Sequence, residues 1–288
     1  MTLPNFLIIG AAKAGTTSLH RYLGQHPAVY VSPVKETNYF WYEGQRDRRP
    51  SVKTRAAYER LFAGVRTETA IGEASPQYLN SPTAPERIRR ELPHARLIAS
   101  LRNPADRAYS GYLEWVRKGL GTASLPEALR PGREFFEHSL YYPRLRRYLD
   151  CFPRSQLRII VFEEFAARPG ATVRDLFEYL EVDPGFVPDT SVVHNATGVP
   201  RSARLNRAVV LVRALWQFVW PVLPAFLRGR GLTARLHQTT LSPAPPLPAD
   251  LRRELLERFR EDIERTGELI GRDLSGWLAG RPARSGPG

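Results

Sequence analysis

The 288-residue chain is poor in cysteine and lysine. Its single cysteine, Cys151, excludes an intramolecular disulfide and is typical of a protein from a reducing compartment. It has only four lysines, so the formal net charge of +13 comes almost wholly from arginine. Such a charge favours anionic ligands, a membrane surface or nucleic acid as partners. We expect no nucleic acid, because the basic residues are spread along the chain without a recognised binding motif.

The sequence also lacks a leader pattern and an uninterrupted membrane-spanning run. No basic leader with an apolar core precedes the first predicted strand at residue 6, so we expect a cytoplasmic protein. The longest apolar stretch, residues 208–227, is interrupted by an arginine and two prolines, which argues against a span. Its tryptophans and flanking arginines would suit a helical insertion over residues 204–230 that contacts a membrane or covers a lipophilic acceptor. A helix packed on the domain explains the pattern at least as well.

Residues 6–23 carry the strongest functional signal. Four apolar residues bounded by Gly10 predict a short buried strand, and Thr16 begins a predicted helix. A strand, a glycine-containing turn and a helix N-terminus together form an anion site, because backbone N–H groups and the helix dipole point at one spot. Gly15 would allow close approach of the backbone, and Lys13 would supply a mobile positive charge. The expected ligand is a phosphate group.

This turn differs from a nucleotide-hydrolysing P-loop at a decisive position. Residues 10–17 match the pattern G-x-x-x-x-G-K-[ST] except that Thr16 stands in place of the lysine. The next strong predicted strand, residues 95–101, ends in Arg102 and not in the aspartate that helps to hold magnesium. We therefore expect a phosphate site without a metal ion. An ordinary strand–turn–helix connection is the plainer alternative.

Two segments resemble the sulfotransferases that use 3′-phosphoadenosine 5′-phosphosulfate (PAPS). Residues 13–18 resemble the 5′-phosphosulfate loop of that family, and residues 101–112 resemble its 3′-phosphate block, a strand ending in Arg-x-Pro followed by a helix that presents a serine. The resemblance implies that Arg102 and Ser110 bind the 3′-phosphate. It also implies that the phosphosulfate is bound by the first segment: Lys13, Ala14, Gly15, Thr16, Thr17 and Ser18.

A third segment is similar to the glycan sulfotransferases of the heparan sulfate type and to bacterial enzymes with a glutamate base. Lys35 and Glu36 precede a pair of polar residues and then aromatic residues. The resemblance implies that Glu36 removes the proton from the acceptor hydroxyl, and Lys35 would favour its ionised form and contact the substrate. From the residues alone, a solvated Lys–Glu pair before a buried aromatic edge is favoured.

Two further segments give weaker resemblances. Residues 73–78 resemble a Glu-x-[Ser/Thr]-Pro-x-Tyr stretch that faces the acceptor in the glycan enzymes, which implies substrate contacts for Glu73 and Tyr78. Ala74 replaces a lysine found in some relatives, and this argues against a heparan-type acceptor. Arg201 and Ser202 would replace the glycine-and-basic loop that closes over the nucleotide, and a basic surface turn is an equal alternative.

The order of predicted elements defines the fold class. Strands alternate with helices, which predicts an α/β fold with a P-loop-like parallel sheet and helices on both faces. Residues 157–162 form the clearest later strand, and we expect Glu163 and Glu164 to begin a loop. We expect a single domain over residues 1–279, in which a Pro-rich connector, residues 241–248, leads to a helix from 249 to 270. Residues 280–288 are predicted to be disordered.

The sequence thus predicts a PAPS-dependent sulfotransferase that needs no metal ion. The acceptor would be a hydroxyl of a sugar, a lipid or a specialised metabolite, reached by in-line displacement. Two alternatives remain: a P-loop nucleotide kinase or NTPase, and a non-enzymatic peripheral membrane-binding module that uses residues 204–230.

Overall fold

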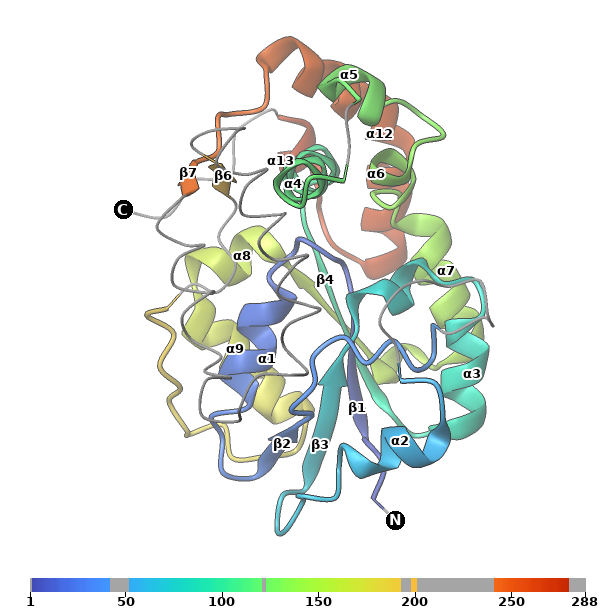
Figure 1. Ribbon diagram of the computed structural model, residues 1–288, viewed down its shortest axis with the longest axis vertical. Helices are drawn as coiled ribbons and strands as arrows, with labels where there is room; N and C mark the ends of the chain where they lie inside the picture. The colour runs from blue at the N-terminus through green and yellow to red at the C-terminus, as the bar shows by residue number, and fades with distance from the viewer. Residues whose placement is uncertain (1, 42–51, 121–122, 193–197, 201–240, 280–288) are drawn as a thin grey trace, which may run out of the picture.

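A five-stranded sheet forms the centre of the protein (Figure 1). The computed structural model describes residues 2–41, 52–120, 123–192, 198–200 and 241–279. Every neighbouring pair in this sheet is parallel, and the strand order is β2-β3-β1-β4-β5. The strands are β1 (Phe6–Gly10), β2 (Val29–Val31), β3 (Ala70–Ala74), β4 (Arg96–Leu101) and β5 (Leu157–Val161).

The central strand β1 lies where the strand order reverses. It pairs with β3 on one side and with β4 on the other, so Phe6 is opposite both Gly72 and Arg96. Gly72 leaves room for the Phe6 ring, because a Cβ at that position would lie 2.3 Å from a ring carbon. The loops after β1 and β4 leave the same edge of the sheet, and such a point is where open parallel sheets bind ligands.

Helices cover both faces of the sheet (Figure 1). Phe6 and Ile8 of β1 point into one core, and Leu7 and Ile9 point into the other. The helices packed on the first face are α1 (Thr16–Leu23), α8 (Phe162–Ala167) and α9 (Pro169–Tyr179). Those on the second face are α3 (Ala84–Glu91), α7 (Tyr142–Cys151) and α12 (Ala249–Ile270).

Helix α4 (Pro104–Arg117) begins just beyond the carboxyl end of β4. The Asn103 side chain caps it by accepting hydrogen bonds from the backbone N–H groups of Ala105 and Asp106, at 3.0 and 3.4 Å. The shorter elements are α2 (Arg55–Arg60), η1 (Pro76–Asn80), α5 (Leu125–Ala128), α6 (Glu134–Glu137), η2 (Arg154–Gln156), α13 (Ser275–Leu278), and the antiparallel pair β6 (Gly198–Pro200) and β7 (Leu241–Pro243).

The predicted fold class is confirmed, with corrections at individual elements. Glu163 and Glu164 do not begin a loop, because helix α8 follows β5 directly. The start of the connector, residues 241–243, forms β7. Strand β3 was not predicted, since its sequence is Ala-Ile-Gly-Glu-Ala and four of these five residues are poor strand formers.

Some predicted segments lie wholly outside the described residues. These are Arg201, Ser202, the predicted insertion 204–230 and the tail 280–288. The single-domain organisation therefore stays a prediction. In the parts of the chain that the structure describes, no helix combines the length and hydropathy of a membrane span.

Candidate functional site

The loop between β1 and α1, here called loop 11–15, turns sharply into the helix. Lys13 and Gly15 both adopt the left-handed conformation, with φ of 72° and 79°. A Cβ on Gly15 would lie 3.0 Å from the rings of Phe162 and Phe165, so both backbone conformation and packing require glycine. Since first-turn N–H groups have no intrahelical acceptor, the start of α1 favours an anion in front of this loop.

Two arginines donate hydrogen bonds to carbonyl groups of loop 11–15. Arg102, directly after β4, donates from Nη1 to the Lys13 carbonyl at 3.2 Å, and its guanidinium stacks 4.9 Å from the centroid of the Phe162 ring. Arg107, on α4, donates from Nε to the Ala12 carbonyl at 3.2 Å. The two predicted phosphate segments are therefore joined by direct hydrogen bonds.

Arg107 is almost completely buried, with 4% of its surface exposed. Its Nη1 donates to the Phe135 carbonyl at 3.1 Å and to Ser139 Oγ at 3.2 Å. These partners and the Ala12 carbonyl are neutral, and burial lowers the pKa of the guanidinium. Arg107 thus connects α4 with loop 11–15, with α6 and with the residues just after α6.

The predicted 3′-phosphate serine lies on the face of α4 that is turned toward loop 11–15. Arg107, Ser110 and Glu114 are spaced i, i+3 and i+7, which places them on one side of the helix. Arg107 and Glu114 both contact loop 11–15, and the buried Ser110 lies between them.

Glu114 forms an ion pair with Lys13. The distance from Glu114 Oε2 to Lys13 Nζ is 3.0 Å, and the lysine side chain is only 15% exposed. Burial lowers the pKa of Lys13, and the Glu114 carboxylate acts in the opposite direction. Burial would raise the pKa of Glu114, but the positive charges of Lys13 and Lys118 outweigh it and bring that pKa to about 2. Glu114 therefore stays ionised near neutral pH.

The predicted base, Glu36, follows the edge strand β2 and lies beside the carboxyl end of β3. Its backbone N–H donates to the Ala74 carbonyl at 2.8 Å. Its side chain is 52% exposed and accepts a hydrogen bond from Lys35 Nζ at 2.7 Å. Glu36 has a left-handed φ of 62°, and Asn38 has 49°. This is an accessible carboxylate on a constrained turn, at the same edge of the sheet as loop 11–15.

Glu73 and Tyr78 are fully buried, so the structure does not expose either to an acceptor. The Glu73 carboxylate accepts hydrogen bonds of 2.7 Å from Tyr78 OH and from Ser75 Oγ, and one of 3.3 Å from Tyr58 OH. Burial raises the pKa of Glu73, and these hydrogen bonds act against that shift. The Ser75 hydroxyl accepts the N–H of Asn38 at 3.1 Å. The network thus supports the turn that carries Glu36.

Three residues of this site were not predicted: Arg107, Glu114 and Phe162. Arg107 lies within residues 101–112, the segment that resembles the 3′-phosphate block, and its spacing of three from Ser110 was the available signal. Glu114 lies four residues after Ser110, which also predicts one helix face. Phe162 follows a buried strand, and nothing in the sequence indicates that Arg102 stacks on it.

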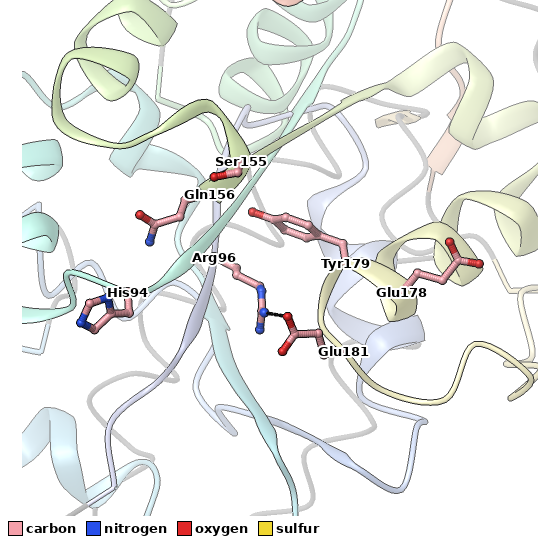
Figure 2. Close-up of a pocket in the computed structure, with 7 residues that line it drawn as sticks. All are labelled: His94, Arg96, Ser155, Gln156, Glu178, Tyr179 and Glu181. Atoms are coloured by element: carbon pink, nitrogen blue, oxygen red, sulfur yellow. Dashed lines mark ion pairs between the residues drawn. The ribbon is translucent and has the colours of Figure 1, made fainter.

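A shallow pocket lies at the opposite, amino-terminal edge of the sheet (Figure 2). Arg96 begins β4 and His94 lies just before it, while Gln156 is the last residue of η2, directly before β5. Arg96 pairs with Glu181. This pocket shares no residue with loop 11–15. Within the described ranges, no three or more His, Cys, Asp or Glu side chains are grouped to hold a metal ion.

The five-stranded parallel sheet and loop 11–15 define the class, an α/β protein with a P-loop-like fold. The sulfotransferase domain family matches residues 3–196, and the chain belongs to this family. The crystal structure of a sulfotransferase from Alicyclobacillus acidocaldarius is 35% identical, covers 96% of this chain and 99% of its own, and has a TM-score of 0.72. The sulfotransferase domain from the curacin biosynthetic pathway, 14% identical with a TM-score of 0.52, supports the fold alone.

Relatives of known activity match part of the chain. Human "bifunctional heparan sulfate N-deacetylase/N-sulfotransferase 2" is 31% identical over 211 residues, which cover 63% of this chain and 22% of that protein. "Membrane-associated sulfotransferase kil1" of Dictyostelium discoideum is 33% identical over 123 residues, 41% of this chain and 25% of that protein. The matches thus span about a fifth to a quarter of these relatives. The predicted family is confirmed: the chain contains a sulfotransferase domain.

Proposed function

We propose that the chain transfers the sulfuryl group of PAPS to an acceptor hydroxyl at the carboxyl edge of its sheet. One observation carries this proposal: the hydrogen bond from Arg102 to the Lys13 carbonyl, which joins the 5′-phosphosulfate and 3′-phosphate segments in one site. In this site, loop 11–15 and the start of α1 bind the 5′-phosphosulfate. Arg102 and Ser110 bind the 3′-phosphate.

The residues present fit this donor. A guanidinium forms charge-assisted hydrogen bonds with phosphate, and its planar shape suits a phosphate's oxygens. Arg102 Nε is buried and has no hydrogen-bond partner within the described residues, and an anionic ligand would satisfy it. The stacking of Arg102 on Phe162 fixes the plane of the guanidinium beside loop 11–15.

The transfer step is an in-line displacement at sulfur. The acceptor oxygen attacks the sulfur and forms a new O–S bond, while the bond from sulfur to the bridging phosphate oxygen breaks. The electron pair of that bond stays on the 5′-phosphate of the leaving nucleotide, where Lys13 stabilises the developing charge. The hydroxyl proton passes to Glu36, which must be ionised and within reach of the hydroxyl.

Glu73 and Tyr78 then act as positioning residues. Tyr78 OH contacts both Glu73 Oε1, at 2.7 Å, and Thr37 Oγ1, at 3.1 Å, directly beside Glu36. Together with the Ser75–Asn38 contact, this buried network holds the turn in its left-handed conformation. Lys35 keeps the Glu36 carboxylate oriented until an acceptor hydroxyl takes the place of the Lys35 ammonium.

The acceptor is a hydroxyl of a sugar, a lipid or a small metabolite. The likeness to heparan sulfate N-sulfotransferases supports a glycan, but those proteins are much longer than the matched region. Some relatives have a lysine at the position of Ala74, and that lysine could contact an acidic glycan. Ala74, which is fully buried, cannot make such a contact, and this supports a less acidic acceptor. Screening a panel of sugars, lipids and phenols with labelled PAPS identifies the acceptor class.

Calorimetric titration of the purified chain tests the donor site. We expect 3′-phosphoadenosine 5′-phosphate (PAP), the spent donor, to bind tightly without metal, and adenosine 5′-phosphate to bind at least tenfold more weakly. Arg102→Ala should remove most of that preference, since a hydrogen bond to a charged group contributes about 1.5–3 kcal/mol. Arg158→Ala is the matched control, because Arg158 also stacks on an aromatic ring, Tyr179, at 5.0 Å. Equal or better binding of magnesium-ATP would reject the proposal in favour of a kinase.

A further inference from the structure

Glu114 places a negative charge beside the lysine that binds the donor anion. Its two carboxylate oxygens have different partners: Oε2 contacts Lys13 Nζ at 3.0 Å, whereas Oε1 contacts Lys118 Nζ at 2.8 Å and Arg117 Nη2 at 3.8 Å. An anionic donor needs the same Lys13 ammonium. The carboxylate and the phosphosulfate therefore compete for one cation.

The arrangement allows this exchange without leaving a buried charge unpaired. Removing one partner of a buried ion pair is strongly unfavourable when the other charge is left alone. Here Glu114, whose side chain is 28% exposed, would keep Lys118 and Arg117 when Lys13 turns to the donor. Lys13 in turn would exchange one anion for another. Both groups thus stay paired throughout.

We propose that Glu114 is a resident counter-ion of Lys13 that competes with the 5′-phosphosulfate group and so limits the affinity for both PAPS and PAP. The inference rests on the proposed function, because it assigns Lys13 to the donor. Glu114 acts through Lys13 and is a positioning residue. Because the pKa of Glu114 is about 2, this competition persists throughout the neutral range. Its effect is to weaken the hold on the spent nucleotide.

The test compares the full-length wild type with Glu114→Gln by calorimetry in metal-free buffer. Glutamine keeps the shape of the side chain and removes its charge. We expect PAP to bind about tenfold more tightly to the variant, since the local charge around Lys13 becomes more positive. Adenosine 3′-phosphate lacks the 5′-phosphate, so its affinity should stay the same. A merely structural role for Glu114 would not separate these two ligands.

Glu127→Gln is the matched control. Glu127 is also paired with two arginines, Arg130 and Arg133, and it lies on α5 away from loop 11–15. Its PAP affinity should equal that of the wild type. Glu114→Ala, which removes the whole carboxylate, should change PAP affinity in the same direction as Glu114→Gln and provides a second measurement if either variant folds poorly.

Two results would overturn the inference: unchanged or weaker PAP binding in Glu114→Gln, or an equal change for PAP and adenosine 3′-phosphate. The first would mean that Glu114 does not compete with the donor for Lys13, and the second would indicate an electrostatic effect on every anion in the site. Failure of the proposed function gives a different result, because PAP would then not bind the wild type without metal.

Discussion

Lys13 and Glu36 share an unusual backbone conformation at the residue scale. Both are non-glycine residues with positive φ, 72° and 62°, and such positions cost about 1–3 kcal/mol each unless the surroundings hold them. Arg102 binds the carbonyl of Lys13, and the Ala74 carbonyl accepts the N–H of Glu36. The fold therefore fixes the two residues proposed for catalysis through their main chains, which leaves the side chains able to meet substrate.

Replacing Glu36 tests the proposed base. Glu36→Gln should lower turnover by about 10²- to 10⁴-fold, the usual contribution of a general base, because an amide cannot accept the hydroxyl proton. PAP affinity should stay close to that of the wild type. The measurement is turnover of labelled PAPS with the best acceptor of the panel, beside calorimetry with PAP. Turnover near the wild-type value would remove Glu36 from the mechanism.

Helix α4 is the element that connects the two halves of the proposed donor site. Its start is capped after β4, and one of its faces contacts loop 11–15 through Arg107 and Glu114. A second contact ties it to α12, where Arg252 pairs with Asp106 through both carboxylate oxygens. The position of α4, and with it Ser110, is therefore set from two sides.

Arg107→Met tests this connection. The substitution keeps an unbranched side chain but removes the donor of three hydrogen bonds, so the free energy of unfolding should fall by about 2–4 kcal/mol. Urea denaturation measures the loss. Arg146→Met, which breaks an exposed pair with Asp150 on α7, should change stability by less than about 0.5 kcal/mol. Equal effects of the two variants would contradict the connecting role of Arg107.

The sequence predicted elements with strong periodicity and missed contacts made across the fold. Helix α12 has the predicted bounds, 249 and 270, because its apolar stripe is continuous. Strand β3 was not predicted, because the reasons for two of its residues lie elsewhere in the fold. Gly72 leaves room for the Phe6 ring, and Glu73 is buried because hydroxyl groups donate hydrogen bonds to it. Lys13 was predicted from local pattern, whereas its partner Glu114 is about a hundred residues away in the chain, and no local pattern links them.

The stability of the whole molecule should depend on pH through His20. This residue is 7% exposed, and both nitrogens of its imidazole ring are buried. Burial, with a further contribution from the charge of Lys35, lowers its pKa from 6.5 to about 4. Between pH 6.5 and 4 the unfolded chain therefore binds more protons at His20 than the folded protein does. Acid in this range lowers the free energy of unfolding.

His20→Leu isolates that effect. Asp262 acts in the opposite direction, because burial raises its pKa to about 6 and the folded protein gains stability as the pH falls toward 4. The useful quantity is thus the difference in unfolding free energy between wild type and His20→Leu. From pH 7 to pH 4, the wild type should lose about 3 kcal/mol of unfolding free energy relative to His20→Leu. A difference that does not change with pH would show that His20 titrates normally.

The central position of β1 in the sheet limits which parts of the site can open. Amides of β1 are protected on both sides, by β3 and β4, and should exchange with solvent only on global unfolding. The turn with Glu36 follows the edge strand β2, and the amides of Ser32 and Glu36 attach it to carbonyl groups of β3. These two amides should exchange through smaller local openings. Hydrogen–deuterium exchange distinguishes the two classes of amide. We therefore expect the turn that bears the proposed base to loosen and admit a bulky acceptor while β1, which precedes loop 11–15, stays closed.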